Sequence, residues 1–183
     1  MRYPAQEFRM KCGETCVLRS PEPEVAAQRV DFLRKVNGET AFMARSAGDA
    51  PGDIELIADV IAEQLEDDAA LEIAAFLDGR MIACGGISPV SRGYPRKRHR
   101  AQLGICVRKS CWGEGLGSGI LQALFQEAPG MGFSQIELTV VAAKARARRL
   151  YQRLGFLEAG RMPNALRNED GSCSDEIWMV KRL

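Results

Sequence analysis

The chain has 183 residues, of which 46% are hydrophobic and 27% charged, and its formal net charge at pH 7 is +1. This composition is typical of an ordinary soluble globular protein and excludes disorder as the default. The near-zero net charge gives no overall electrostatic case for a nucleic-acid or anionic-membrane partner.

Apolar periodicity and turn signals predict the elements of the first half of the chain. Alternating or continuous apolar runs predict strands, and apolar residues at helical spacing predict helices. The predictions, in order, are a strand over 12–19, a helix over 25–36 closed by Asn37-Gly38, a helix over 54–65 capped by Asp53, and a hairpin with strands over 71–77 and 80–87.

A connection rich in Pro, Gly and Arg over 88–100 leads into the more regular second half. There the sequence predicts a strand over 101–107, a helix ending near 128, a strand over 135–141, a helix over 143–154 and two strands flanking a turn at 168–171. No linker or internal repeat interrupts this order. We therefore expect a single α/β domain over residues 1–183.

The six cysteines are expected to be reduced and structural. The sequence has no C-x-x-C pair, and His99 is its single histidine, so familiar zinc-ligand spacings are missing and we expect no metal site. The sequence also has no apolar run of about 18 residues and no apolar signal segment at its start. These features favour a cytoplasmic protein without a membrane partner.

The segment 112–119 reads W-G-E-G-L-G-S-G and is the strongest functional signal in the chain. An apolar, strand-like run precedes it, and apolar residues at helical spacing follow it. Glycines let the backbone approach an anion closely, and the first turn of a helix offers unpaired N–H groups at the positive end of its dipole. The segment predicts a phosphate cradle, with a merely flexible turn as the alternative.

Two common nucleotide-binding patterns do not fit this cradle. A P-loop ends in glycine, lysine and serine or threonine, and no lysine stands here. A dinucleotide fingerprint starting at Gly113 would need its third glycine where Ser118 stands. A third interpretation comes from the segment 144–156, about thirty residues further on, which reads K-A-R-A-R-R-L-Y-Q-R-L-G-F.

Together the two segments resemble the motifs of the GCN5-related N-acetyltransferase (GNAT) superfamily. The acetyl-coenzyme A (acetyl-CoA) signature of that superfamily, Q/R-x-x-G-x-G/A, corresponds to 112–117 here. Its later helix motif, roughly N-x-x-A-x-x-L-Y-x-x-x-G-F, corresponds to 144–156. Either motif alone is weak, whereas the two in this order and spacing are specific, and they cover about residues 99–160. The chain departs from the pattern at Trp112, whose side chain we expect to point off the turn, and at Lys144.

The resemblance implies a fold, a reaction and a cofactor. The fold is a central mixed β-sheet of about six to seven strands with helices on both faces. The function is acetyl-CoA-dependent transfer of an acetyl group to a primary amine of a small molecule, amino acid or peptide, by direct attack in a ternary complex. The alternative is a non-catalytic module that binds acetyl-CoA and presents its basic loop to a protein or RNA partner. A homodimer is also compatible, because dimers are frequent in the superfamily.

The resemblance also implies which residues bind the cofactor: Cys106, Val107, Gly113, Gly115, Gly117, Ser118 and Lys144. The glycine-turn N–H groups would bind the pyrophosphate. The end of the preceding strand, Cys106 and Val107, would hydrogen-bond the pantetheine arm, and the Val107 N–H could then act as the oxyanion donor. Lys144 replaces an asparagine that contacts this arm, and a solvated lysine at a helix start is the alternative.

Three further residues have implied roles in the chemistry. Tyr151 aligns with a tyrosine that acts as general acid toward the departing thiolate, and a packed core tyrosine is the alternative. His99 could be the general base if the strand extends that far, although neighbouring arginines suggest a solvated hairpin tip. Glu39 lies in the segment that commonly walls the acceptor site, where it could hold an ammonium group or simply be solvated.

Overall fold

The computed structural model describes residues 1–40, 42–43, 47–49, 52–168 and 170–183. Its strands are β1 (Gln6–Arg9), β2 (Thr15–Arg19), β3 (Leu71–Leu77), β4 (Arg80–Pro89), β5 (Arg100–Val107), β6 (Gln135–Val141), β7 (Leu157–Arg167) and β8 (Cys173–Arg182). Its α-helices are α1 (Ala26–Gly38), α2 (Ile54–Glu66), α3 (Leu116–Glu127) and α4 (Ala145–Arg153). Short 3-10 helices lie at Pro23–Val25, Ala47–Asp49, Pro95–Lys97 and Lys109–Cys111.

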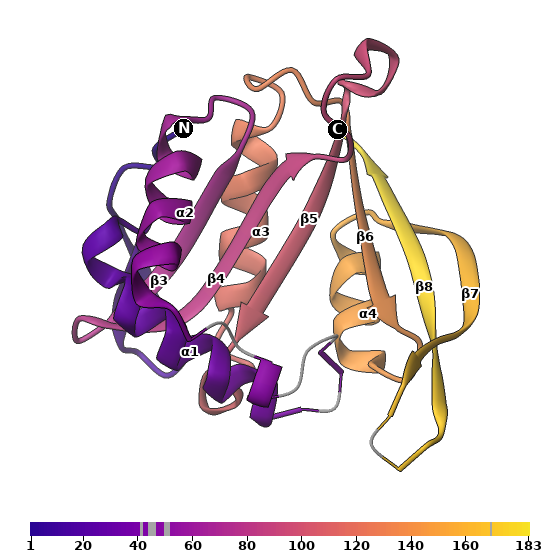
Figure 1. Ribbon diagram of the computed structural model, residues 1–183, viewed down its shortest axis with the longest axis horizontal. Helices are drawn as coiled ribbons and strands as arrows, with labels where there is room; N and C mark the ends of the chain where they lie inside the picture. Colours follow the sequence, from indigo (N-terminus) through magenta and orange to yellow (C-terminus); the bar gives the residue numbers. More distant parts are fainter. Residues whose placement is uncertain (41, 44–46, 50–51, 169) are drawn as a thin grey trace.

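Within these described residues the strands form one eight-stranded sheet in the order β1-β2-β3-β4-β5-β6-β8-β7 (Figure 1). β5 and β6 are parallel, and the other neighbouring pairs are antiparallel. None of the helices in the described residues is long and apolar enough to cross a membrane. The expected α/β fold with a mixed sheet is confirmed.

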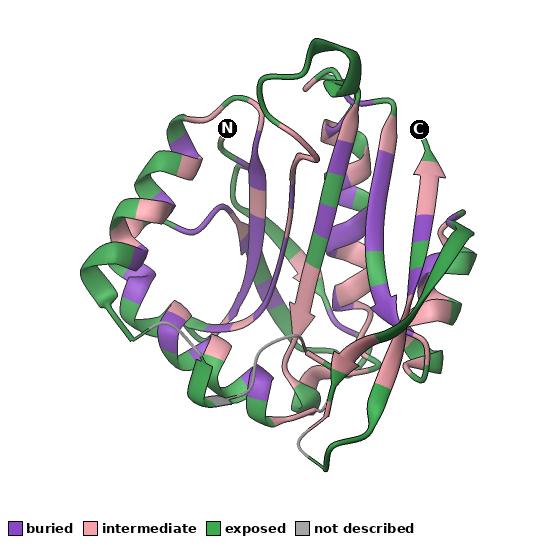
Figure 2. Ribbon diagram, turned by 45° about the vertical axis from the view of Figure 1, so that its right-hand side comes forward, coloured by how far each residue is buried: buried purple, intermediate pink, exposed green. Residues whose placement is uncertain are grey.

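Helices cover both faces of the sheet (Figure 1). On one face, Phe32 and Val36 of α1 pack against Ala74 and Phe76 of β3, and α2 packs against α1. On the other face, α3 and α4 join a larger core cluster that includes Tyr151. Figure 2 shows the buried residues concentrated in the central strands, whereas β7 at the edge of the sheet is mostly exposed.

Local sequence signals explain several element boundaries. The Asp53 side chain accepts a hydrogen bond from the Leu56 N–H at 3.1 Å, and this cap starts α2 where the sequence predicts it. Asp78 and Gly79 both have positive φ, 48° and 72°, as a type I′ turn requires, so the two strands of the predicted hairpin meet directly.

β5 and β6 separate soon after they begin, and this separation creates the space for the functional site. Their pairing in the described residues covers only Arg100–Gln135, Ala101–Ile136 and Gln102–Glu137, although β5 continues to Val107 and β6 to Val141. Figure 1 shows the two strands diverging toward their C-terminal ends. β5 remains paired with β4 through Val107. Its edge toward β6 is therefore left open.

The structure differs from the sequence-based expectation mainly at the N-terminus. The sheet of the described residues has eight strands rather than six to seven, because β1 precedes the predicted strand over 12–19 and pairs with β2, which forms within it. Gly13 has a φ of 96° and lies in the turn between β1 and β2. β1 is largely exposed and mostly polar, so apolar periodicity does not reveal it. The first helix also extends past its expected stop, through Gly38.

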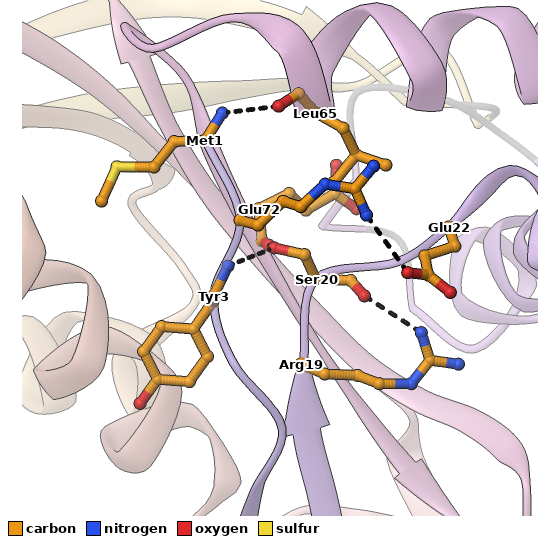
Figure 3. Close-up of polar contacts among 8 residues, drawn as sticks. Met1, Tyr3, Arg19, Ser20, Glu22, Leu65 and Glu72 are labelled. Atoms are coloured by element: carbon orange, nitrogen blue, oxygen red, sulfur yellow. Dashed lines mark hydrogen bonds and ion pairs between the residues drawn. The ribbon is translucent and has the colours of Figure 1, made fainter.

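Hydrogen bonds join the N-terminal segment to β2, β3 and α2 (Figure 3). The Ser20 hydroxyl donates to the Glu72 carbonyl at 2.8 Å and accepts from the Tyr3 N–H at 2.9 Å. The Met1 nitrogen donates to the Leu65 carbonyl at 3.1 Å, near the end of α2. These bonds fix the first residues of β3, including the backbone of Glu72.

Candidate functional site

A groove with a cavity volume of about 520 Å³ lies where β5 and β6 separate. It takes residues from the end of β5, the glycine turn, the first turn of α3, α4 and the end of α1. From the sequence-predicted set it includes Cys106, Val107, Gly113, Gly115, Gly117, Ser118, Lys144 and Tyr151. The structure therefore brings together the two motifs that the sequence singles out.

The edge of β5 that faces β6 presents backbone groups to this groove. On the opposite side of β5, the Arg108 N–H donates to the Ile82 carbonyl of β4 at 3.0 Å. Backbone groups of successive residues point to opposite sides of a strand, so the N–H of Val107 points toward the open side. The Trp112 indole N–H donates to the Val107 carbonyl at 2.8 Å. Trp112 therefore folds back onto β5 instead of pointing off the turn, which corrects our expectation.

Cys106 contributes its side chain rather than its backbone. It is the register partner of Cys84, and the same alternation turns its N–H and carbonyl toward β4. The backbone of Cys106 therefore faces away from the open edge, whereas the backbone of Ile105 faces it. A contact of Cys106 with a pantetheine arm stays a prediction, and it would come from the side chain. The Cys106 thiol lines the groove, where burial raises its pKa.

The glycine turn has the geometry of an anion cradle. Gly113 and Gly115 have φ of 99° and 90°, in a region that side-chain-bearing residues rarely adopt. The Gly119 N–H closes the first turn of α3 onto the Gly115 carbonyl at 2.9 Å. The preceding N–H groups, including those of Gly117 and Ser118, consequently have no partner within the helix and lie beside the groove. Such N–H groups at the positive end of the dipole favour an anion.

The β1–β2 hairpin holds the glycine turn from the other side. The Lys11 N–H donates to the Glu114 carbonyl at 3.2 Å, and the Cys12 N–H donates to the Glu114 carboxylate at 2.7 Å. A Cβ built on Gly119 would lie 2.4 Å from the Phe8 ring. Gly119 is therefore a packing glycine, needed so that β1 can lie against α3.

Cationic side chains surround the cradle. Lys11, Lys144, Arg146 and Arg153 line the groove. The Arg146 guanidinium lies 5.8 Å from the centre of the Trp112 ring, and a Cβ on Gly113 would lie 3.2 Å from Arg146 Nη2. Lys144 is half-buried at the start of α4, and burial lowers the pKa of its ammonium group. This concentration of positive charge suits a ligand with several phosphate groups.

Tyr151 lines the groove and is buried, with 8% of its surface exposed. Its ring packs edge-on against Phe156, with centroids 5.8 Å apart. Its hydroxyl has no hydrogen-bond partner in the part of the chain that the structure describes, and burial raises its pKa to about 12. The hydroxyl is thus protonated at neutral pH and free to donate into the groove.

The Glu39 carboxylate has hydrogen-bond partners within the chain. It accepts hydrogen bonds from Arg108 Nε at 2.7 Å and from the Lys109 N–H at 2.6 Å. Both partners belong to the connection between β5 and the glycine turn. The expected contact of Glu39 with an acceptor ammonium group is not supported, because the carboxylate joins the end of α1 to this connection.

Replacing Glu39 tests that structural role. We expect Glu39→Ala to lower the free energy of unfolding by about 2 kcal/mol, because hydrogen bonds to a charged group are lost and Arg108 is left unpaired. Urea denaturation would measure this loss, with the exposed Glu63 of α2 replaced by alanine as the control. Equal stability of the two variants would contradict the role.

His99 does not join the other predicted residues. It is exposed and directly precedes β5, whereas Val107 ends that strand. Eight residues at about 3.3 Å each place the two roughly 25 Å apart. The His99 carbonyl accepts hydrogen bonds from the N–H groups of Ser134 and Gln135, at 3.0 and 3.2 Å. We therefore do not retain His99 as a general base. No group of three or more potential metal ligands occurs among the described residues.

Comparisons with known proteins agree with this site. The profile of the acetyltransferase (GNAT) family matches residues 39–156, which include the groove and both motifs. The chain belongs to the GNAT acetyltransferase family. An L-amino acid N-acetyltransferase from Escherichia coli (strain K12) is 30% identical over 122 residues, which cover 65% of this chain and 73% of that protein.

Solved structures show how far the GNAT fold extends over the chain. A GNAT-family acetyltransferase from Streptococcus pneumoniae has a TM-score of 0.86 and 30% sequence identity, and the match covers 92% of this chain and 99% of that chain. A Salmonella typhimurium protein, solved with its cofactor acetyl-CoA, has a TM-score of 0.79 and 18% identity, with 92% and 94% coverage. The latter shows the fold alone.

Acetyl-CoA is the cofactor of GNAT acetyltransferases, and the groove of this member fits it. The unpaired N–H groups and cations suit the pyrophosphate, and the open edge of β5 suits the amide groups of the pantetheine arm. A side chain at Gly113 would meet Arg146, so glycine keeps the cradle clear.

Sequence analysis missed some residues of this site. Phe8, Lys11 and Arg146 belong to it through contacts between distant segments. Of these three residues, only Arg146 could be predicted from the sequence, because it lies two residues after Lys144 within the second motif. Phe8 and Lys11 lie on a hairpin that apolar periodicity did not detect.

Proposed function

We propose that this GNAT acetyltransferase, acting as a single domain over residues 1–183, transfers the acetyl group of acetyl-CoA to the nitrogen of a primary amine. The amine belongs to a small molecule, an amino acid or a peptide. The E. coli relative is named as an L-amino acid N-acetyltransferase, which supports nitrogen as the acceptor atom.

In this proposal the donor is held by groups that already line the groove. The N–H groups of the glycine turn, with Gly117 and Ser118, bind the pyrophosphate. Lys144 donates to the pantetheine arm from the start of α4, and the backbone of Ile105 lies along the same arm. The cofactor supplies the activated acetyl group as a thioester.

Two groups of the chain then act on the reacting atoms. The Val107 N–H donates to the carbonyl oxygen as that oxygen gains negative charge, which stabilises the transition state. The Tyr151 hydroxyl donates its proton to the departing thiolate. Its high pKa keeps the proton available at neutral pH. The single observation that carries the proposal is this unpartnered hydroxyl in the same groove as the glycine cradle.

A thiol-release assay tests the proposed function. With acetyl-CoA and a panel of amines, amino acids and short peptides, we expect at least one acceptor to raise thiol release tenfold or more above the rate without acceptor. Mass spectrometry should find an N-acetylated product. Binding of acetyl-CoA with no turnover on any acceptor would favour the non-catalytic module instead.

A further inference from the structure

One buried ion pair has no role among the groups proposed to bind acetyl-CoA. Arg29 of α1 and Glu72 of β3 face each other between the helix and the sheet, with Nη1 and Oε2 2.9 Å apart. Their side chains keep 14% and 12% of their surface exposed, so the pair is largely buried yet still reaches solvent. Charged groups are rarely placed in such a position without a role or further partners.

The pair is not saturated with hydrogen bonds. Arg29 Nε and Glu72 Oε1 are buried and have no hydrogen-bond partner among the described residues, and Arg29 Nη1 has Glu72 Oε2 as its ion-pair partner. Burial raises the pKa of the Glu72 carboxyl, and the charge of Arg29 opposes that rise. Buried polar atoms without partners are unfavourable, and a ligand that satisfies them gains affinity from doing so.

Two glycines lie side by side in the sheet between Glu72 and the end of β5. Glu72 is the register partner of Gly86, and Gly86 is the register partner of Gly104. Gly104 is exposed, and a Cβ built on it would meet no described atom within 4 Å. Cys106, which lines the groove, lies two residues further along β5 on the same face.

Helix α1 connects the pair to the groove as well. Arg29, Phe32 and Val36 follow one another at helical spacing on the side of α1 that meets the sheet, and Val36 lines the groove. Burial raises the pKa of the Cys106 thiol most, Lys144 opposes that rise, and Glu72 and Arg29 add smaller effects of opposite sign. The pair therefore lies within electrostatic reach of the end of β5.

The separation suits a small acceptor. Two strand spacings of about 4.8 Å and two residue steps of about 3.3 Å place the Cα atoms of Glu72 and Cys106 roughly 12 Å apart. The long side chains of Glu72 and Arg29 cover part of that span. The rest of the span is short. An α-amino acid bound to the pair by its charged groups would therefore have its amino group close to the reacting carbonyl at the end of β5.

We propose that Arg29 and Glu72 recognise the charged head of an amino acid acceptor, whose carboxylate binds Arg29 and whose ammonium group faces Glu72. This inference rests on the proposed function and narrows its acceptor to amino acids with a free carboxylate. Val25 and Phe32, close to Arg29 in sequence, and Ala74, two residues after Glu72 on β3, belong to one apolar cluster, which favours an apolar amino acid.

Kinetics with matched acceptors test the proposal. The double variant Arg29→Gln/Glu72→Gln removes both charges and leaves neither one unpaired. For L-leucine, L-methionine and L-phenylalanine, we expect it to reduce the ratio of kcat/KM for the amino acid to kcat/KM for its amide at least tenfold. The KM for acetyl-CoA should change less than twofold. The double variant Arg100→Gln/Glu137→Gln, which removes an ion pair at the other end of β5, is the control. An unchanged ratio overturns the inference.

Calorimetry provides a readout that does not need turnover. In the presence of CoA, the wild type should bind at least one of the three amino acids, with a Kd that the Arg29/Glu72 variant raises tenfold or more and the control leaves unchanged. Binding of none of them, or equal binding by both variants, overturns the inference. Thiol release with amines but an unchanged acid-to-amide ratio removes only this inference. If none of the acceptors raises thiol release, the proposed function is removed. The calorimetric comparison then still decides whether Arg29 and Glu72 bind an amino acid.

Discussion

Tyr151→Phe should lower kcat about 100-fold, the lower end of what a positioned general acid contributes. Phenylalanine keeps the ring and its packing against Phe156, so the Kd for acetyl-CoA and the stability of the fold should stay near the wild-type values. Steady-state kinetics of thiol release would measure the first effect, and calorimetry with acetyl-CoA the second. Unchanged turnover would remove Tyr151 from the chemistry.

The pH dependence of Tyr151 follows from its pKa, which burial raises from 10 to about 12. The hydroxyl stays protonated across the whole range below pH 10, so it adds no falling limb to the pH–rate profile there. Between pH 10 and 12 the folded protein retains a proton that the unfolded chain loses. The contribution of Tyr151 to stability is therefore complete below pH 10 and is lost as the pH rises through 12.

Gly115→Ala should raise the Kd for acetyl-CoA at least tenfold. Gly115 precedes α3 with a φ of 90°, and an alanine held there costs about 1–3 kcal/mol of backbone strain. The turn can relieve this strain only by rotating away from its present path, which carries the N–H groups at the start of α3 out of the cradle. Calorimetric titration with acetyl-CoA would measure the change.

Gly160→Ala is the matched control for this substitution. Gly160 lies on the exposed strand β7 without a positive φ, and a Cβ there meets no described atom within 4 Å. Its affinity for acetyl-CoA should equal that of the wild type. A Gly115→Ala variant that binds as tightly as this control would show that the conformation of Gly115 does not matter for the cradle.

The central part of the fold could be predicted because its signals are local. The hairpin around Asp78-Gly79 and the strand over 135–141 are marked by apolar runs and turn residues within a few positions. β1 lacks such a signal, because Gln6, Glu7 and Arg9 are polar and the strand lies at an edge of the sheet.

In the candidate site, too, residues within local motifs could be predicted, whereas contacts between residues far apart in the sequence could not. The glycine turn and Tyr151 belong to local motifs, and the structure brings both to one groove. Glu39 contacts Arg108, 69 residues away, so nothing near it in the sequence could indicate that contact. For His99, alternation along the strand predicted a shared face with Val107 but not the distance between them. Arg29 and Glu72 likewise meet only through packing of α1 on the sheet.

The short pairing of β5 with β6 has a mechanical consequence. Three paired positions join the two parts of the sheet, one formed by β1–β5 and the other by β6, β8 and β7. A ligand that forms hydrogen bonds with the free edge of β5 and with α4 connects these two parts where backbone hydrogen bonds between β5 and β6 are missing. Ligand binding then restricts the motion of the two parts of the sheet relative to each other. While the ligand is bound, it stabilises the sheet as an additional strand would.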